Sequence, residues 1–478
     1  AKLGQQAITT SLKAGAVGFA IVAVFMIAVY LIPGLAAVLA LSLYVGLILI
    51  LLVSFEVTLT LPGVAGIILS IGMAVDANVI IFTRIKEEIG AGKAVKTAID
   101  NGFQKALSAI VDGNVSTLIA AAVLFWRGSG TVKGFASTLA IGIVLSMFTA
   151  LFVTKAILNA LYNLGLDDPK FYGVSKEKKA INFLGKKNLC FIISCVVIVA
   201  GWVTMGVHGA GGDGVLNYSM EFKGGTSTNV TFNEDMSLED ISSKVVPVVI
   251  KVTGDAEVQA QKVTGTNEVI IKTKTLSVDQ RQALNDALVE NFGVEEDKIT
   301  AESISGAVSN EMKRDAIEAV IIATICMLIY IWFRFKDIRF ATSAVLALLH
   351  DVLVVLTFYA AARWSVGSTF IACMLTIVGY SINATIVIFD RVRENLKVKT
   401  NKQSLADLVN LSITQTFTRS INTSLTTVVM VIVLFIMGVS SVREFALPLI
   451  VGIVCGTYSS VCITGALWYV MTTHKKEK

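Results

Sequence analysis

One carboxylate in this chain lies where a charge is costly and where a proton could be carried. Asp76 follows Pro62 by fourteen residues and precedes Arg84 by eight, in a mostly apolar run. A charge at that depth of a membrane costs about 3 kcal/mol or more, so the group must be paired, protonated or functional. Asn78 follows at i+2, and Asn383 holds the matching position in a second copy of the segment. We favour a proton-carrying aspartate over one that only locks two helices together.

Further ionisable residues lie in the C-terminal half. His350 and Asp351 fall near the middle of an apolar run, and as neighbours they point to different faces of a helix, so only one need line a path. A relay or gating role and a structural hydrogen bond both stay open for this pair. Arg419 opens the apolar run 415–437. It is either an interfacial arginine that reaches into water or a fixed cation that promotes proton release from a facing carboxylate.

Polar residues are distributed unevenly between the two halves, as a single asymmetric ion path requires. The repeat places Ala109 opposite Arg419, and the stretch around Ala109 carries Asp112, Asn114 and Thr117. The candidate proton-relay residues are Asp76, Asn78, Asp351, Asn383 and Arg419. The candidates for gating or relay are His350, Asp112 and Asp390.

These side chains need a membrane bundle to position them. The 478 residues are 54% hydrophobic and 16% charged, with a mean hydropathy of +0.73. This composition excludes an ordinary soluble domain and predicts a polytopic α-helical membrane protein. Apolar runs of about twenty residues predict eleven spanning helices, which are 14–32, 35–56, 62–83, 104–125, 134–158, 189–208, 315–333, 340–361, 367–390, 415–437 and 444–472.

Lysine and arginine concentrate in alternate loops, at 84–96, 170–187, 334–339, 391–402 and 475–478. The positive-inside rule makes these loops cytoplasmic and places residue 1 and segment 209–314 outside. The net charge of +5 therefore reflects topology, and no nucleic-acid partner is predicted. All six cysteines fall in predicted spans without CxxC spacing, so we expect neither disulfides nor a metal site.

The chain contains an internal repeat. Segment 72–87 resembles 379–394, and the Lys133-Gly134-Phe135-Ala136 sequence is echoed at 443–446. Two homologous halves in the same orientation are the simplest explanation. We expect a five-span half (1–158), a cytoplasmic linker (159–188), a first span of the second half (189–208), an outer domain (209–314) and five more spans (315–478). Since the first half lacks a counterpart of span 189–208 and of an outer domain, we expect the sequence to be a fragment or truncated form.

Segment 209–314 shows alternating strand and helix patterns. Strands are predicted at 226–232, 257–263, 268–273 and 299–303, and helices at 238–252 and 278–292. This βαββαβ order is typical of an α+β ferredoxin-like sandwich. The segment contains no His, no Cys and no phosphate-binding loop, so we expect a binding or mechanical module rather than an enzyme. Glycine pairs at 211–212 and 224–225 are expected in hinges or turns.

Several motifs resemble a known family. Residues 60–66, 76–79 and 125–136 are similar to the SecD signature, and residues 222–226, 347–351, 379–383, 390–395 and 456–460 are similar to the SecF signature. Together they resemble the fused SecD/SecF family over nearly the whole chain. The resemblance implies a bacterial cytoplasmic-membrane protein of the resistance-nodulation-division (RND) superfold. It would be an accessory factor of the Sec translocon that uses the proton-motive force to promote outward movement of secretory polypeptides.

The resemblance also implies partners and site residues. The partners would be the SecYEG translocon, an unfolded secretory polypeptide, and YajC- and YidC-type proteins, all in the lipid bilayer; protons would be the coupling ion, with no other cofactor. The family's first-half aspartate falls on Asp76 and its second-half arginine on Arg419. Its second-half aspartate falls on Ala384, so this chain lacks that carboxylate. A variant proton path, weakened coupling and an engineered alanine all stay open.

Two other functions compete with export of proteins. One is a proton-driven RND-type exporter of small molecules or lipids, which would need a ligand-sized apolar cleft. The other is a scaffold for the translocon that transports nothing, which Ala384 makes more credible. A polar outer segment rich in Lys, Glu, Thr and Asn favours protein export.

Overall fold

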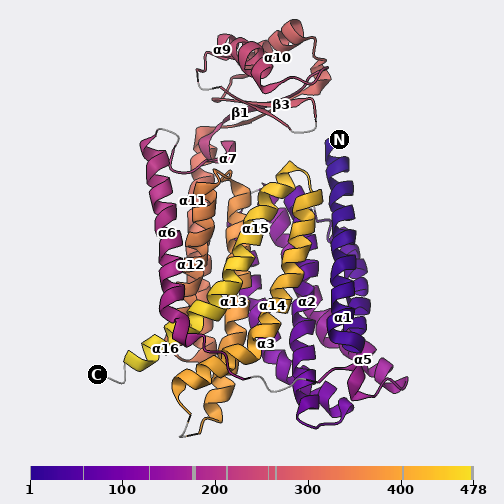
Figure 1. Ribbon diagram of the computed structural model, residues 1–478. Coiled ribbons are helices and arrows are strands. Elements are labelled where there is room, and N and C mark those ends of the chain that lie inside the picture. The colour runs from indigo at the N-terminus through magenta and orange to yellow at the C-terminus, as the bar shows by residue number, and fades with distance from the viewer. Residues whose placement is uncertain are drawn as a thin grey trace. The chain divides into compact units, whose positions relative to one another are not determined.

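The computed structural model describes residues 2–57, 59–128, 130–174, 179–211, 214–256, 258–263, 266–400 and 403–474. It is mainly helical, with one small antiparallel sheet (Figure 1). Among the described residues, ten helices are long and apolar enough to cross a membrane. The predicted fold class, a polytopic helical membrane protein with a small α+β domain, is confirmed. The basic residues of 175–178, 401–402 and 475–478 lie outside the described residues.

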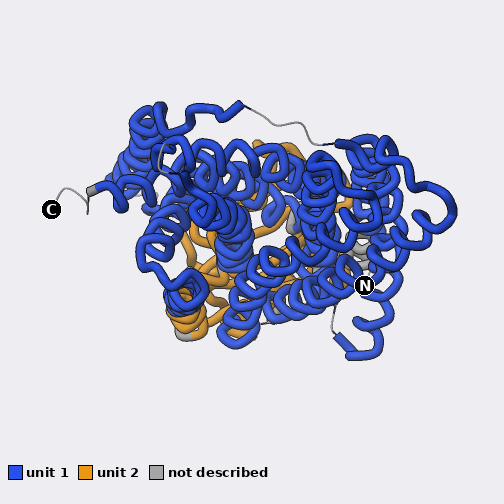
Figure 2. The backbone as a smooth tube through the Cα atoms, turned by 90° about the horizontal axis from the view of Figure 1, so that it is seen from below, with its two compact units in different colours: residues 1–216, 318–364, 369–478 blue, residues 217–317, 365–368 orange. Residues whose placement is uncertain are grey.

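Two compact units make up the chain (Figure 2). The first, which we call the membrane unit, comprises Ala1–Leu216, Glu318–Trp364 and Thr369–Lys478. The second, the small unit, comprises Asn217–Ile317 and Ser365–Ser368. Each unit is described by itself below.

The helices of the membrane unit follow the repeat. The first half has α1 (Lys2–Ser54), α2 (Leu61–Gly90), α3 (Val95–Arg127), α4 (Gly130–Phe148) and α5 (Thr154–Asn163). The second has α6 (Lys187–Ala210), α11 (Gly306–Phe335, which begins in the small unit), α12 (Ile338–Ala361), α13 (Ser368–Lys397), α14 (Leu405–Met437), α15 (Ser440–Ser459) and α16 (Gly465–His474). Short 3₁₀ turns at Pro169–Phe171 and Leu184–Lys186 lie in the segment that joins the halves.

Helix α1 is two helices joined at a sharp reversal. Its apolar part, Thr9–Ser54, has 46 residues and would reach about 69 Å if straight, roughly twice the thickness of a hydrocarbon core. Leu31 breaks the helix with a φ of 55°, and the backbone at Gly34 lies directly against the Met26 carbonyl. The two predicted runs 14–32 and 35–56 are the two arms of this hairpin, which explains why eleven runs correspond to ten elements.

Local signals explain where the long helices start. Thr60 caps α2, because its side chain accepts a hydrogen bond from the Gly63 amide at 3.1 Å, and Pro62 follows in the first turn. Ser404 caps α14 by accepting from the Asp407 amide at 3.0 Å. Helix α14 therefore begins ten residues before the predicted start at 415. The prediction that Arg419 opens its helix is wrong, because Leu405–Met437 form one continuous helix that includes Arg419 in its interior.

The two halves repeat fine details of backbone geometry. Gly128 and Gly438 end α3 and α14 with the same dihedral angles, φ −71° and ψ 157°. Each donates its amide to a carbonyl four residues earlier at 2.8 Å. Within the membrane unit each half also has a π-turn between two α-helical segments, at Thr149–Val153 and at Ser460–Thr464. The internal repeat seen in the sequence is therefore a structural repeat.

The small unit is a split βαβ sandwich. Strands β1 (Gly225–Thr231), β2 (Gln259–Lys262), β3 (Glu268–Thr273) and β4 (Ile299–Ile304) pair in the order β2-β3-β1-β4, all antiparallel. Helices α9 (Val246–Thr253) and α10 (Val278–Phe292) cover one face of the sheet (Figure 1). The short α7 (Met220–Lys223) precedes β1, and a single turn, α8 (Leu238–Asp240), is joined to α9 by a π-turn (Ile241–Val245).

The core of the small unit comes from alternating residues of the sheet and one stripe of each helix. Val230 and Ile271 point from the sheet toward Val249, Leu284 and Leu288, all fully buried. The predicted ferredoxin-like order is confirmed. Gly224, with a φ of 74°, lies directly before β1, and Gly225, with a φ of 139°, is the first residue of that strand; glycine adopts both angles without strain. Gly212, and Glu257 at the start of one predicted strand, lie outside the described residues.

Candidate proton-relay site

Asp76 lies between the two halves and is bound from the second half on both of its oxygens. Asn383 of α13 donates to Oδ2 at 2.6 Å, and Nη2 of Arg419 on α14 lies 3.5 Å from Oδ1. Asp76 and Arg419 are only 7% and 6% exposed. A carboxylate at this depth is thus compensated by one cation and one amide, which lowers the cost of burying it.

Close approach of the helices brings these groups together. Gly72 of α2 lies against Thr427 of α14, where an added Cβ would be 3.2 Å from the backbone. The matching Gly379 of α13 lies 3.1 Å, by the same measure, from Thr117 of α3. Gly113 of α3 lies directly behind the Asn383 amide and leaves no room for a Cβ. Small residues at these crossings therefore set the position of the candidate relay groups.

A four-residue charge box joins the C-terminal ends of α2 and α13. Arg84 contacts Glu87 at 3.2 Å and Glu394 at 2.7 Å. Arg391 contacts Glu394 at 3.3 Å and Glu87 at 2.5 Å. The repeat relates Arg84 to Arg391 and Glu87 to Glu394, so each half makes the same contacts with the other. This is the reciprocity of a two-fold axis, and it lies on the side predicted to face the cytoplasm.

A small cavity lies between the relay site and the charge box. The volume of this cavity that the centre of a water molecule can occupy is about 20 Å³. One water molecule needs roughly 10–15 Å³ of such volume. Most of its lining consists of repeat-related pairs, and the full lining is Ile80 and Val387, Thr83 and Asp390, Arg84 and Arg391, Ala109 and Arg419, with Gln415 and Thr416. The cavity therefore lies on the pseudo-two-fold axis.

Asp112 belongs to a second charged cluster, next to that cavity. It accepts from the Tyr330 hydroxyl at 2.9 Å and from Nε of Arg334 at 2.5 Å, both on α11. The same arginine contacts Ser108 and lies 3.6 Å from Oδ1 of Asp390. Arg334 thus holds two carboxylates, one from each half.

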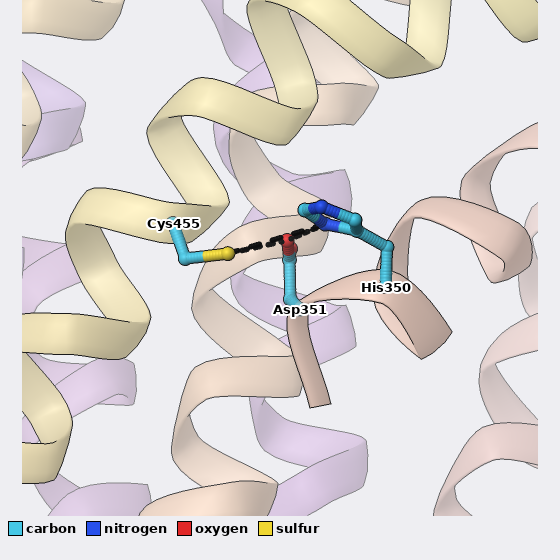
Figure 3. Close-up of side chains that lie close together, drawn as sticks. All are labelled: His350, Asp351 and Cys455. Carbon is cyan, nitrogen blue, oxygen red and sulfur yellow. Dashed lines mark hydrogen bonds and ion pairs between the residues drawn. The ribbon is translucent and has the colours of Figure 1, made fainter. Parts of the chain in front are cut away.

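His350 and Asp351 form a third buried cluster. Nδ1 of His350 is 2.9 Å from Oδ1 of Asp351, so the prediction that the two point to different faces is wrong. Side chains 100° apart on a helix can still meet when both lean toward the same neighbour. Nε2 of His350 is 2.9 Å from the Ser194 hydroxyl of α6. Cys455 lies on the other side of the carboxylate, 3.3 Å from it, so that Asp351 sits between the imidazole and the thiol (Figure 3).

The hydroxyls around Asp351 complete this network. Ser381 of α13 donates to Oδ2 at 2.5 Å and Ser459 of α15 at 2.8 Å. His350, Asp351 and Cys455 have ligand atoms within 4.8 Å of one another, which a metal ion could use. However, both oxygens of Asp351 already accept hydrogen bonds from the protein. We interpret the cluster as a hydrogen-bonded network that ties α6, α12, α13 and α15 together.

The structure separates residues that the sequence analysis grouped. Asp351 contacts Ser381, whereas Asp76 contacts Asn383, two residues further along α13. Residues at i and i+2 are 200° apart on a helix, so the two acids lie on opposite sides of α13. Asn78 is buried, and its Oδ1 has no hydrogen-bond partner among the described residues. Arg419 lies inside the bundle rather than at a water interface.

Some functional contacts were not predicted from the sequence. The charge box was overlooked because its two arginines were counted only as basic loop charge and its two glutamates were not considered, although the repeat relates each member to another member. Tyr330 and Cys455 carried no signal, because a tyrosine or cysteine in an apolar run is usually packing. Ala384 follows Asn383 directly, and its methyl group can neither donate nor accept a proton.

These observations define the class: a polytopic membrane protein of two like-oriented helix repeats, with a buried acid, amide and arginine between them. The family model described as protein export membrane protein SecD/SecF, C-terminal, matches residues 1–164 and 285–474. The chain therefore belongs to the SecD/SecF family of protein export membrane proteins, which confirms the resemblance seen in the sequence. As in that family, it is a multi-pass protein of the bacterial inner membrane.

Individual relatives cover both halves. The protein translocase subunit SecDF of Bacillus subtilis is 38% identical over 98% of this chain and 65% of its own length. The subunit SecF of Sebaldella termitidis is 35% identical over 62% of this chain and 93% of its own length. The crystal structure of SecDF from Thermus thermophilus, a translocon-associated membrane protein, superposes with a TM-score of 0.86 at 34% identity, over 99% of this chain and 63% of that one. The chain thus spans less than two thirds of the SecDF relatives it matches.

Proposed function

We propose that this chain is an accessory part of the Sec protein-export machinery and uses the proton-motive force to promote outward movement of secretory polypeptides. The names of its relatives support the first part, since they are called translocase subunits. The Asp76–Asn383–Arg419 cluster supports the second, because a titratable acid between two halves can bias their packing. The proposed partners are the SecYEG translocon, an unfolded polypeptide and YajC- and YidC-type proteins. The proposed coupling ion is the proton, without another cofactor or enzymatic step.

The energy of a few protons is sufficient for such a device. One charge that crosses 100 mV releases about 2.3 kcal/mol. A shift of a two-state equilibrium from 1:99 to 99:1 takes about 5.5 kcal/mol, so two or three protons would switch it. Protonation of Asp76 removes its attraction to Arg419, which is the only full charge the acid contacts among the described residues. The packing of α2 against α14 would then change, and release of the proton inward would restore it.

The test is proton flux and polypeptide translocation in proteoliposomes under an imposed gradient. Asp76→Asn should abolish proton-dependent translocation, because the amide keeps the shape and loses the titration. Asp286→Asn, on the exposed face of α10, is the matched control and should behave as the parent chain. Translocation that persists unchanged in Asp76→Asn would sink the proposal and favour a scaffold. Flux that appears only with Ala384→Asp would mean that the chain as written is uncoupled.

A further inference from the structure

The cavity between Asp76 and the charge box is lined by equivalent positions of the two halves, but the side chains at some of these positions differ in their chemistry. Its lining pairs Ile80 with Val387 and Arg84 with Arg391, which differ little. The remaining two repeat-related pairs differ strongly, because Thr83 corresponds to Asp390 and Ala109 corresponds to Arg419. Among the described residues, the cavity therefore has one lining carboxylate, Asp390 of the second half, whereas the acid of the relay site is supplied by the first half.

The repeat places these acids at two levels along the helix axes: an upper level at Asp76 and Asn383, and a lower level, nearer the charge box, at Thr83 and Asp390. Asp390 follows Asn383 by seven residues on α13, and Thr83 follows Asp76 by seven residues on α2. Residues seven apart lie on the same helical face, about 10 Å apart along the axis. At the upper level α2 carries the acid and α13 the amide. At the lower level α13 carries the acid and α2 a threonine.

Arg419 connects the two levels but cannot itself pass a proton. One nitrogen of its guanidinium contacts Asp76, while Nε and Nη1 are buried without a hydrogen-bond partner among the described residues. Buried donors require partners, and the cavity that Arg419 lines has room for one or two waters. A guanidinium keeps its protons at any physiological pH. Transfer between the levels must therefore run through water that Arg419 orients.

We propose that Asp390 accepts the proton that Asp76 releases, through water in this cavity, and passes it toward the cytoplasm. This inference rests on the proposed function. The Asp76 carboxyl group loses its proton to water and becomes a carboxylate beside Arg419; a chain of water through the cavity passes a proton on to the Asp390 carboxylate, which becomes a carboxyl group. Charge is conserved at each transfer, and no further reactant is needed.

Charged groups on α11, α3, α2 and α13 suit Asp390 to this task. Nη2 of Arg334 on α11 lies 3.6 Å from Oδ1 of Asp390, and the same guanidinium also contacts Asp112 of α3. Arg334 therefore stabilises the deprotonated Asp390 carboxylate only in part. Arg84 of α2 and Arg391 line the same cavity but are each paired twice in the charge box. The Asp390 side chain is 15% exposed, which provides a way onward to water.

The experiment compares three variants of the full chain in proteoliposomes. Asp390→Asn, and Asp390→Thr, which copies Thr83, should each reduce proton flux at least about tenfold. Asp390→Glu should retain most of it, because the acid is kept. Infrared difference spectra after a pH jump give a second readout, since the carboxyl band that Asp390→Asn removes should be absent in Asp390→Thr and present in Asp390→Glu.

The outcomes separate this inference from the proposed function. If Asp76→Asn abolishes flux while Asp390→Asn and Asp390→Thr carry parental flux, the inference is overturned and the proposed function stands. If Asp76→Asn retains flux, both fail, because Asp390 then has no donor. Loss of flux in Asp390→Asn, Asp390→Thr and Asp390→Glu alike, with no carboxyl band assigned to Asp390, would also overturn it and assign the residue a packing role with Arg334.

Discussion

The charge box makes a quantitative prediction about how the two halves are held together. Its arginines are nearly buried, with side chains 12% and 13% exposed, whereas Glu87 and Glu394 are 27% and 45% exposed. Loss of one partner from a buried ion pair costs about 3–5 kcal/mol, and an exposed pair contributes about 0.2–1 kcal/mol. For this intermediate case we expect Arg84→Gln to lower the free energy of unfolding by about 2 kcal/mol.

Symmetry sharpens this expectation. Arg84 and Arg391 have the same partners at similar distances, so Arg84→Gln and Arg391→Gln should have equal effects within about 0.5 kcal/mol. In double-mutant cycles the pairs that join the halves, Arg84 with Glu394 and Arg391 with Glu87, should couple by about 1–2 kcal/mol. The pairs within one helix are i,i+3 contacts, for which about 0.2–0.5 kcal/mol is typical.

Reversible unfolding in mixed detergent micelles measures these free energies. The exposed pair of Lys96 with Asp100, 3.9 Å apart and about half exposed on both sides, is the control, and Lys96→Gln should cost about 0.5 kcal/mol or less. The reasoning is refuted if coupling between the halves is no stronger than coupling within one helix. It is also refuted if the two arginine variants differ by more than about 1 kcal/mol.

Two further predictions concern packing. Gly113→Ala should displace the Asn383 amide from Asp76, lower the free energy of unfolding by about 1–3 kcal/mol through overpacking and reduce proton flux. The control Gly46→Ala has open space around it and should be neutral or stabilising in the same assays. Equal flux in both variants would contradict the contact between Gly113 and Asn383. Leu284→Ala, in the core of the small unit, should destabilise that unit by about 2–5 kcal/mol, as measured by local hydrogen exchange. The control Val278→Ala, at a side chain that is 70% exposed, should change the stability of the unit by about 0.5 kcal/mol or less. An equal loss of exchange protection in both variants would contradict the assignment of Leu284 to the core.

Hydropathy predicted the spans well because membrane thickness constrains both length and composition. It did not place the start of α14, because the polar stretch 415–422 separates the apolar run from residues 405–414, which are themselves mostly apolar and were assigned to the preceding loop. The cap at Ser404, with Asp407 three residues later, was the available signal for the true start of α14. Reading it would have placed Arg419 well inside the helix rather than at its start.

Contacts between distant segments were predictable only where the repeat implied them. The meeting of Asp76 and Asn383 followed from their matching positions, because two like-oriented halves place equivalent residues around one axis. The partners of Asp351 did not follow, since Ser381 and Ser459 are ordinary helix residues until the fold places them beside a carboxylate. Which acid faces which side of α13 depends on helix rotation, and that is set by packing throughout the bundle.

The paired π-turns allow the order of events in the history of this protein to be inferred. A π-turn accommodates one residue more than an α-helix needs, and it arises most simply by insertion of a single amino acid. Thr149–Val153 and Ser460–Thr464 lie within one residue of the same place in each half. Two independent insertions at one place are less economical than one, so the insertion is older than the duplication. The single ancestral half already had it, and the differences at Thr83 and Asp390, and at Ala109 and Arg419, arose after the copies became separate.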